Sequence, residues 1–312
     1  MAVQAKVMTE QEKKQRIAAL RAELKELQAT PRSDWHTAFE AFLRFKTYRY
    51  KGISIRIEVE IGEDAPRTDY LILTDDEMQN FEEAFFRIFK KINIIEYKNP
   101  NDSLNERVIH IIAGYANLLV GTAAHEGDIP VDQVTLSIFR SVKNPDLWEK
   151  MTNAGELVET DIPGIYHVVG ITKMPFQIVV TSELQGAECA ACRALTDKAQ
   201  EADIEQVIDD ATSETVDVVR EYYRIFLNLI AEKNPEVFEE IRRDDYMKYP
   251  ALMKVLEAEV NEKVSNAEQE TTVSHIKDIM TKLKYTVEQA MDLLSIPETQ
   301  RDIYTNLISK KS

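Results

Sequence analysis

The stretch Asn93-Ile94-Ile95-Glu96-Tyr97-Lys98-Asn99-Pro100 places an acid and a base two residues apart within an apolar run. An apolar run of this length, ending in Asn and Pro, is typical of a β-strand. Side chains on a strand alternate between its two faces, so we expect Glu96 and Lys98 to share one face. Ile95 and Tyr97 then point to the opposite face. The stretch is therefore predicted to be a strand that presents a carboxylate and an ammonium group side by side.

A second apolar run, Thr68-Asp69-Tyr70-Leu71-Ile72-Leu73, lies upstream and carries one acid near its start. If the two runs pair as strands, Asp69, Glu96 and Lys98 converge at one end of a sheet. Two carboxylates suit a hard divalent cation, which takes oxygen ligands. A neighbouring lysine can orient water or neutralise charge that develops on a phosphate group. The pattern points to a metal-dependent phosphodiesterase, whereas an isolated E-x-K on a strand is more often a solvated face.

Further stretches of the chain, together with these two runs, resemble a known family of proteins. They are Trp35-His36-Thr37-Ala38-Phe39, Arg67-Thr68-Asp69-Tyr70-Leu71, Arg87-Ile88-Phe89, Asp102-Ser103-Leu104, Ile129-Pro130-Val131-Asp132 and Pro175 to Leu184. Together they resemble the PD-(D/E)XK nuclease superfamily, and within it the recombination-promoting nuclease or transposase-like proteins of bacteria. The similarity covers residues 35–195, with a weaker likeness near the C-terminus. The chain departs from the family pattern at Thr68, where a proline would precede the aspartate.

This resemblance implies a restriction-endonuclease-like core and a metal-dependent DNA endonuclease. It implies that Asp69 and Glu96, with the backbone carbonyl of Tyr97, bind Mg²⁺ or Mn²⁺. Lys98 would position the attacking water and stabilise the pentavalent phosphate. DNA is then the expected partner. The second interpretation is a catalytically inactive nuclease-fold scaffold that acts as a binding or assembly module.

Three further residues are accessory candidates for the same site. Glu40 lies on a predicted helix at 35–48, where many members of the nuclease fold place an extra acid. Glu58 lies on a predicted strand at 53–61, eleven residues before Asp69. Tyr115 lies on a predicted helix that runs to residue 120. Each of the three has an alternative interpretation without a role in catalysis. Glu40 could be an ordinary exposed acid on its helix, Glu58 could form a salt bridge to a neighbouring arginine, and Tyr115 could be a core residue.

The overall pattern predicts an α/β (α+β) fold in three parts. Residues 1–30 contain an amphipathic helix, residues 31–196 form a nuclease-like domain with a mixed β-sheet flanked by helices, and residues 197–312 form an all-α region. Within the middle part we also expect a helix over 75–91 and strands at 134–141, 165–169 and 176–181. The C-terminal helices are predicted at 201–210, 213–232, 235–243, 249–265, 272–283 and 286–309.

Composition limits the possible partners. The chain has 312 residues and a net charge of −16, which argues against a nucleic-acid coat or a membrane-surface protein. A nuclease remains compatible because a bound metal changes the local field. No apolar run approaches the roughly 20 residues that span a bilayer. The first residues lack the apolar core of a signal peptide, so we expect a cytoplasmic protein that does not bind membranes.

The sequence does not decide whether the protein self-associates. Ile17, Leu20, Leu24 and Leu27 form a short seam on the helix at 9–29, which suits either a homo-oligomer or docking on the adjacent domain. The C-terminal helices are the other candidate oligomer contact.

The two cysteines, Cys189 and Cys192, form a C-x-x-C. A redox pair and half of a zinc site are the functional interpretations. A zinc site needs two further ligands, and the five histidines show no paired spacing. Two reduced thiols in a helix are the favoured interpretation.

Overall fold

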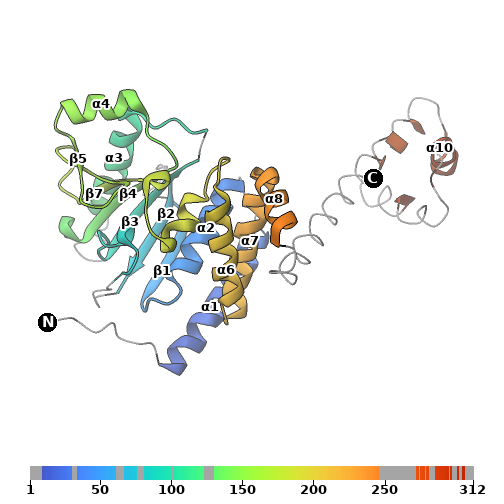
Figure 1. Ribbon diagram of the computed structural model, residues 1–312, viewed down its shortest axis with the longest axis horizontal. Helices are drawn as coiled ribbons and strands as arrows, with labels where there is room; N and C mark the ends of the chain where they lie inside the picture. Colours follow the sequence, from blue (N-terminus) through green and yellow to red (C-terminus); the bar gives the residue numbers. More distant parts are fainter. Residues whose placement is uncertain are drawn as a thin grey trace. The chain divides into compact units, whose positions relative to one another are not determined.

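The computed structural model describes most of the chain (Figure 1). Described are residues 9–29, 34–60, 67–75, 81–99, 101–122, 130–245, 272–273, 275–277, 279–280, 285–294, 296, 301 and 304–305. Contacts divide the chain into two compact units, Met1–Tyr246 and Met247–Ser312. The predicted limits at residues 30 and 196 both fall inside the first unit.

The first unit is built on one seven-stranded β-sheet, and the mixed character of this sheet agrees with the prediction. Its strands are β1 (Ile53–Glu60), β2 (Arg67–Thr74), β3 (Ile92–Lys98), β4 (Val134–Arg140), β5 (Leu157–Glu159), β6 (Ile165–Val168) and β7 (Phe176–Val180). The spatial order is β1-β2-β3-β4-β7-β6-β5. The three central strands β3, β4 and β7 are parallel, and the outer pairings are antiparallel.

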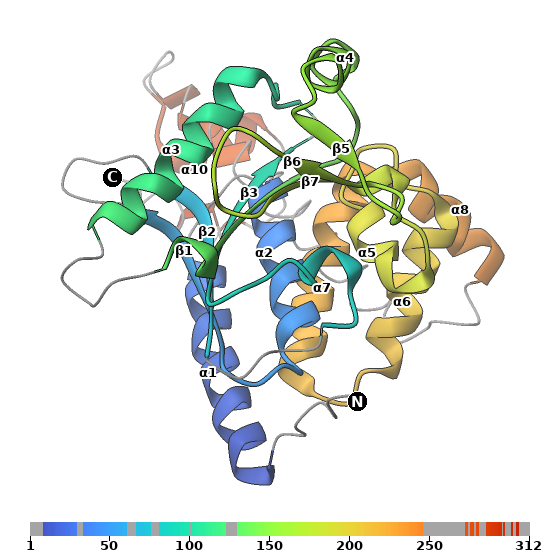
Figure 2. The same cartoon turned by 90° about the vertical axis from the view of Figure 1, so that its left-hand side faces the viewer.

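Helices cover both faces of this sheet (Figure 2). The described helices of this unit are α1 (Glu10–Ala29), α2 (Asp34–Thr47), α3 (Glu106–Thr122), α4 (Pro145–Asn153), α5 (Ala190–Arg193), α6 (Glu201–Ser213), α7 (Asp217–Lys233) and α8 (Pro235–Asp245). The helices α6, α7 and α8 confirm three of the predicted C-terminal helices. Helix α4 and strand β5 were not predicted from the sequence.

One face of the sheet packs against α3 and α4. Apolar residues spaced three or four apart on α3, among them Ile109, Ile112 and Ala116, are buried against Ile94 and Ile138 of the central strands. This spacing is the amphipathic stripe that a helix needs to cover a sheet. The face therefore forms one continuous apolar core.

The opposite face packs against α2 through aromatic rings. Phe39 stacks on Tyr97 of β3 at 4.4 Å between ring centroids and also contacts Tyr70 and Phe139 on the neighbouring strands. Buried aromatic pairs of this kind stabilise a core beyond their burial alone. Helix α2 is thereby fixed against the middle of the sheet.

Helix α1 docks on this layer. Leu20 is fully buried, and its carbonyl accepts a hydrogen bond from the hydroxyl of Tyr222 on α7 at 2.8 Å. Leu27 is buried as well. Docking on the adjacent helices, one of the two roles considered for the seam, is thus what the structure shows.

The helix predicted over 75–91 is wrong for the described part of that segment. Residues 81–91 contain only a 3₁₀ turn, Ala84–Phe86. A helix would bury Ile88 on the stripe of Phe81, Phe85 and Phe89, but the structure buries Phe86 instead and leaves Ile88 partly exposed. Phe85 and Phe86 are neighbours in sequence and pack edge to face at 4.7 Å. Tertiary burial of four aromatic rings outweighs the local helical pattern.

The second unit contains helix α10 (Val287–Leu293), which begins in a capping box formed by Thr286 and Gln289. A small apolar cluster stabilises this unit. Its buried members are Val273, Ile276, Ala290, Met291, Ile296 and Tyr304. The helix predicted at 249–265 lies outside the described residues.

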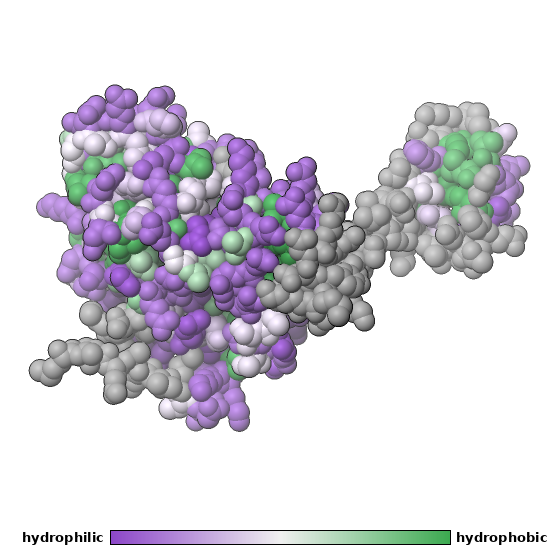
Figure 3. Space-filling model, viewed as in Figure 1, coloured by the Kyte–Doolittle hydropathy of each residue, from purple (hydrophilic) through white to green (hydrophobic). Residues whose placement is uncertain are grey.

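The molecular surface reflects the acidic composition. Hydrophilic residues dominate the face of the first unit seen in Figure 3. Among the described residues, no helix combines the length and the apolar character that crossing a membrane requires.

Candidate active site

The candidate site lies where two neighbouring strands separate. Strand β2 pairs with β3 as far as Tyr70 and Ile95. Beyond that pair, β2 continues along β1 to Arg67, and β3 continues along β4 to Lys98. The separation leaves the next residues of both strands without ladder partners across it, and these residues include Asp69 and Glu96.

The side chain of Asp69 spans this separation. Its Oδ2 accepts a hydrogen bond from the backbone N–H of Tyr97 at 2.9 Å. The N–H and C=O of a residue in an antiparallel strand point to the same edge, so the Tyr97 carbonyl is also directed toward β2. The structure thus brings the Asp69 carboxylate and the backbone N–H of Tyr97 together, whereas a ligand role for the Tyr97 carbonyl stays a prediction.

Glu96 and Lys98 lie side by side on one face of β3, which confirms the predicted alternation. Lys98 Nζ donates to Glu96 Oε1 at 2.7 Å. Ile95 and Tyr97 are buried on the opposite face, where Tyr97 stacks on α2. The E-x-K pattern is therefore a partly buried ion pair rather than a solvated face.

The charges of these groups influence one another. Burial raises the pKa of Glu96 above its ordinary value, and the negative charge of Asp69 raises it further. Burial acts to lower the pKa of Lys98, but Glu96, Asp69 and Asp102 together raise that pKa. Lys98 is consequently a firmly protonated ammonium group beside two carboxylates.

His36 of α2, which was not among the predicted site residues, lies beside Asp69. Its Nε2 lies 3.6 Å from Asp69 Oδ2, the oxygen that Tyr97 also contacts. The interaction with Asp69 raises the pKa of His36, while burial opposes the rise. The helix is held in place by the hydroxyl of Tyr70, which donates to the His36 carbonyl at 2.8 Å.

Asp102 is a third acid close to the site. It lies in the turn after β3, where its Oδ2 accepts a hydrogen bond from the side-chain amide of Asn99 at 2.6 Å. Its charge contributes to the raised pKa values of His36 and Lys98. The stretches that carry the family resemblance contained both His36 and Asp102. Their spacing in the sequence gave no sign that His36 lies beside Asp69 or that the charge of Asp102 acts on His36 and Lys98.

Tyr115, an accessory candidate, lies on α3 within electrostatic reach of the site. Burial raises the pKa of its phenol, and the charges of Glu96 and Asp69 raise it while Lys98 opposes them. The ring is partly exposed. Tyr115 is therefore not a fully buried core residue, and its accessory role stays a prediction.

Glu58, the second accessory candidate, lies on β1 beside Asp69. The register pairs Ile57 with Tyr70 and Val59 with Thr68, which leaves Glu58 opposite Asp69. Its backbone has φ 48°, a left-handed conformation uncommon for a residue with a side chain. The side chain is exposed.

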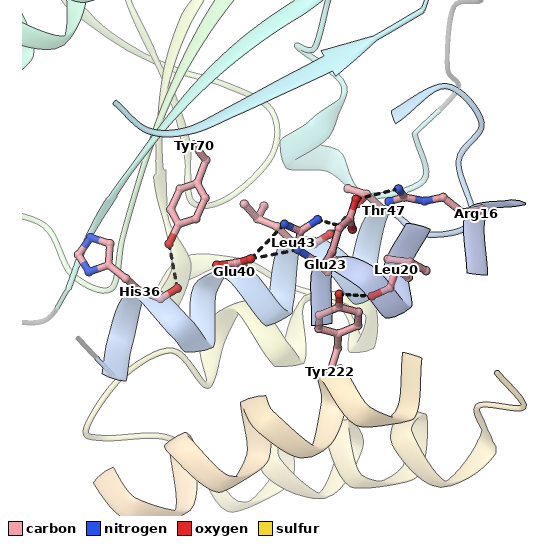
Figure 4. A network of polar contacts seen from close by, with 10 residues as sticks. Arg16, Leu20, Glu23, His36, Glu40, Leu43, Thr47, Tyr70 and Tyr222 are labelled. Carbon is pink, nitrogen blue, oxygen red and sulfur yellow. Dashed lines mark hydrogen bonds and ion pairs between the residues drawn. The ribbon is translucent and has the colours of Figure 1, made fainter. Parts of the chain in front are cut away.

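Glu40, the third accessory candidate, takes part in a different cluster (Figure 4). Its carboxylate accepts hydrogen bonds from Nε and Nη2 of Arg44 at 3.1 and 3.0 Å, and both residues are buried. Arg44 also pairs with Glu23 of α1, which lies 3.7 Å from Arg16. These contacts give Glu40 a structural role between α1 and α2.

The two cysteines are buried and free. Burial raises the pKa of Cys189 to about 11 and raises that of Cys192 as well. Both thiols are therefore protonated at neutral pH, in agreement with the favoured interpretation of reduced thiols.

Side-chain ligands for a metal are few. Within the described ranges, no group of three or more His, Cys, Asp and Glu side chains is arranged to hold a metal ion. Comparison with protein-family models, with curated proteins and with solved structures finds no match to this chain.

Proposed function

We propose that this protein is a metal-dependent DNA endonuclease with a restriction-endonuclease-like core, of the recombination-promoting nuclease or transposase-like type. The observation that supports this proposal is the meeting of Asp69, Glu96 and Lys98 where β2 and β3 separate. An acid on each of two strands, a backbone carbonyl between them and an adjacent ammonium group are the parts that phosphodiester hydrolysis needs.

The donor set fits Mg²⁺ or Mn²⁺. Mg²⁺ is usually bound by one or two carboxylates and completes its shell with waters and substrate phosphates. Asp69 and Glu96 would supply the carboxylates, and the carbonyl of Tyr97 is directed to the same opening. The raised pKa of Glu96 reflects unfavourable burial and repulsion from Asp69, both of which a divalent cation relieves. When bound, such a cation supplies Lewis-acid activation of the phosphate and of the attacking water.

Lys98 would position the attacking water. Its ammonium group, held by Glu96, can donate to the attacking water and offset the charge that builds on the phosphate oxygens. The new bond joins the water oxygen to phosphorus as the bond to the leaving sugar oxygen breaks, so the products are a phosphate monoester and a hydroxyl. Tyr115, whose pKa responds to the charges of Glu96, Asp69 and Lys98, would be a further candidate contact for a phosphate group.

The second candidate function is an inactive scaffold that keeps the fold as a binding or assembly module. Two observations favour it: Lys98 already pairs with Glu96, and His36 already lies next to Asp69. Such a cluster neutralises its own charge in the absence of a metal. The net charge of −16 also disfavours DNA unless a cation lowers the repulsion at the site.

Cleavage of supercoiled plasmid with Mg²⁺ or Mn²⁺ distinguishes the nuclease from the inactive scaffold. The wild type is compared with Lys98→Ala and Asp69→Ala, and with Lys173→Ala, which removes an exposed lysine. The nuclease proposal requires nicking by the wild type and the Lys173 control, and its loss in both site variants at unchanged thermal stability. Absence of cleavage with either metal, or cleavage that survives both site substitutions, favours the scaffold.

A further inference from the structure

A polar pocket of about 500 Å³ lies at the C-terminal end of α2. Its walls come from five parts of the first unit: the end of α2, the segment before the 3₁₀ turn, the turn that leads into α5, the end of α6 and the middle of α7. Helix α7 packs against both α2 and α6, so segments far apart in the sequence meet around one space. The volume lies in the range of small-molecule sites, roughly 300–1,000 Å³.

The pocket is separate from the candidate active site. His36 lies near the N-terminal end of α2, beside Asp69, whereas Lys46 of the pocket lies at the C-terminal end of the same helix. At about 1.5 Å of rise per residue, the two positions are well over one helical turn apart along the axis. None of the described residues that line the pocket was a candidate for the active site.

Carboxylates outnumber basic groups on the walls of this pocket. Among the described residues, two basic side chains line it, Lys46 and Arg49, and the acids are Glu82, Glu83, Glu188, Asp210 and Glu214. Both basic groups already have partners. Lys46 Nζ donates to the backbone carbonyl of Glu188 at 2.7 Å, and Arg49 pairs with Glu82 at 3.3 Å. The excess of negative charge favours a cationic ligand.

Tyr223 of α7 presents a polar group without a partner at the pocket. The residue is 5% exposed, and its ring stacks on Phe45 at 4.0 Å between centroids. The hydroxyl of Tyr48, which also lines the pocket, donates to Glu214 at 2.6 Å. The Tyr223 hydroxyl, in contrast, makes no hydrogen bond within the part of the chain that the structure describes. Burial raises the pKa of Tyr223, and the charges of Asp210 and Glu214 raise it further. Buried polar groups are normally hydrogen-bonded, so this phenol is available to a ligand.

The acidic wall beside Tyr223 is held in place by the chain itself. Gln206, Asp210 and Ser213 are four and three residues apart on α6, which places them on one face of the helix. Asp210 Oδ1 accepts a hydrogen bond from the Gln206 amide at 2.9 Å. Glu214 directly follows α6, and its Oε1 accepts from the two backbone N–H groups after it at 2.8 Å each. Two carboxylates are therefore already ordered for a ligand, which reduces the entropic cost of binding.

We propose that this pocket binds a linear aliphatic polyamine, whose ammonium groups contact the carboxylates and the Tyr223 hydroxyl. An ammonium group only donates hydrogen bonds, and the carboxylates and the phenol oxygen can all accept them. The acids come from separate elements, Glu82 and Glu83 from one side and Asp210 and Glu214 from another. Several cationic groups on one chain match this distribution better than a single compact ion does.

The aromatic rings of the pocket suit the same ligand. The ring faces of tyrosine attract cations, and the Arg49 guanidinium already lies 6.0 Å from the centroid of the Tyr48 ring. The rings of Tyr48 and Tyr223 also offer apolar surface to the carbon chain of a polyamine. This inference concerns a second site and does not depend on the proposed nuclease function.

The test measures binding of spermidine to the full chain by calorimetry, at fixed ionic strength and without DNA. The pocket variants are Asp210→Asn and Tyr223→Phe, and the second keeps the ring that stacks on Phe45. Asp209→Asn is the matched control, because it removes the same charge from an exposed neighbour on α6 that does not line the pocket. A diol of similar chain length is the neutral control ligand, and Mg²⁺ is the compact cation. Circular dichroism and thermal unfolding verify that each variant is folded.

We expect saturable binding of spermidine by the wild type and none of the diol. Asp210→Asn should weaken this binding about tenfold, the effect of one charge-assisted contact. Tyr223→Phe should weaken it about fivefold, the effect of one neutral hydrogen bond. Asp209→Asn should bind spermidine as the wild type does. Spermidine should also raise the thermal midpoint of the wild type more than that of Asp210→Asn, because a ligand that binds only the folded state stabilises it.

Loss of affinity in both folded pocket variants, with the Asp209 control unchanged, supports the site. The inference is overturned if the wild type shows no saturable binding, or if either pocket variant binds spermidine as tightly as the wild type does. It is also overturned if Asp209→Asn loses as much affinity as Asp210→Asn, or if Mg²⁺ at equal ionic strength displaces spermidine, since both results indicate general attraction to an acidic surface. Because the measurement contains no DNA, a failure of the nuclease proposal leaves its result unchanged.

Discussion

Replacement of Glu40 tests whether this residue is an accessory acid or a structural one. Glu40 is 1% exposed and accepts two hydrogen bonds from Arg44, which is 3% exposed. Glu40→Ala leaves the Arg44 guanidinium buried beside the Glu23 carboxylate. Removing one member of a buried ion pair costs roughly 3–5 kcal/mol. Because Glu23 still offsets part of the charge, we expect the lower end, about 3 kcal/mol.

The assay is urea unfolding followed by tryptophan fluorescence. The chain has two tryptophans, Trp35 and Trp148, and both lie in the first unit, so the signal reports on that unit alone. With an m-value of about 3 kcal/mol/M in urea, the expected loss lowers the midpoint by about 1 M. The double variant Glu40→Leu with Arg44→Met removes both charges and should recover most of the stability, because an apolar pair of similar volume replaces a buried ion pair at little cost.

Two results would refute this reasoning. One is a urea midpoint for Glu40→Ala that lies within about 0.2 M of the wild-type midpoint, instead of the expected decrease of about 1 M. The other is a double variant no more stable than the single one. If Glu40→Ala instead loses DNA cleavage at unchanged stability, Glu40 acts at the active site after all.

Three further predictions follow from burial and charge. Phe39→Ala removes a fully buried ring between α2 and the sheet, so the unfolding free energy of the first unit should fall by about 3–5 kcal/mol in the same assay. Cys189 and Cys192 are buried and the pKa of Cys189 is about 11, so neither thiol should react with a disulfide reagent at pH 8 until urea unfolds the protein; rapid native reaction would contradict this. The pKa of His36 is raised by Asp69, so the folded state holds this proton more tightly than the unfolded state does. The resulting stability is fully present below about pH 6.5 and is lost as pH rises through the raised value; in chelator, His36→Gln should remove this part of the pH dependence.

Local sequence pattern determined much of the first unit. Alternation over 53–61 and 93–98 predicted β1 and β3 and the face shared by Glu96 and Lys98, because the side-chain period of a strand is fixed by its backbone. Apolar stripes three and four residues apart predicted α2, α3 and α7 for the equivalent reason in a helix. These features depend only on neighbouring residues.

Local pattern failed where burial is decided by distant parts of the chain. The aromatic residues from Phe81 to Phe89 have helical spacing, yet they pack as a 3₁₀ turn because both Phe85 and Phe86 are buried. Glu40 looks like any helix acid in the sequence, and only the tertiary packing around α2 buries it beside Arg44. A single sequence contains no record of such partners.

Part of the candidate site could be predicted from the sequence, and part of it is visible only in the tertiary structure. The sequence named Asp69, Glu96 and Lys98, because an acid and an E-x-K on two strands are visible as residue types and spacing. Only the tertiary structure separates β2 from β3 after Tyr70 and brings His36 to Asp69. Strand pairing joins residues tens of positions apart, and its register is set by the packing of the whole sheet, which no local period encodes.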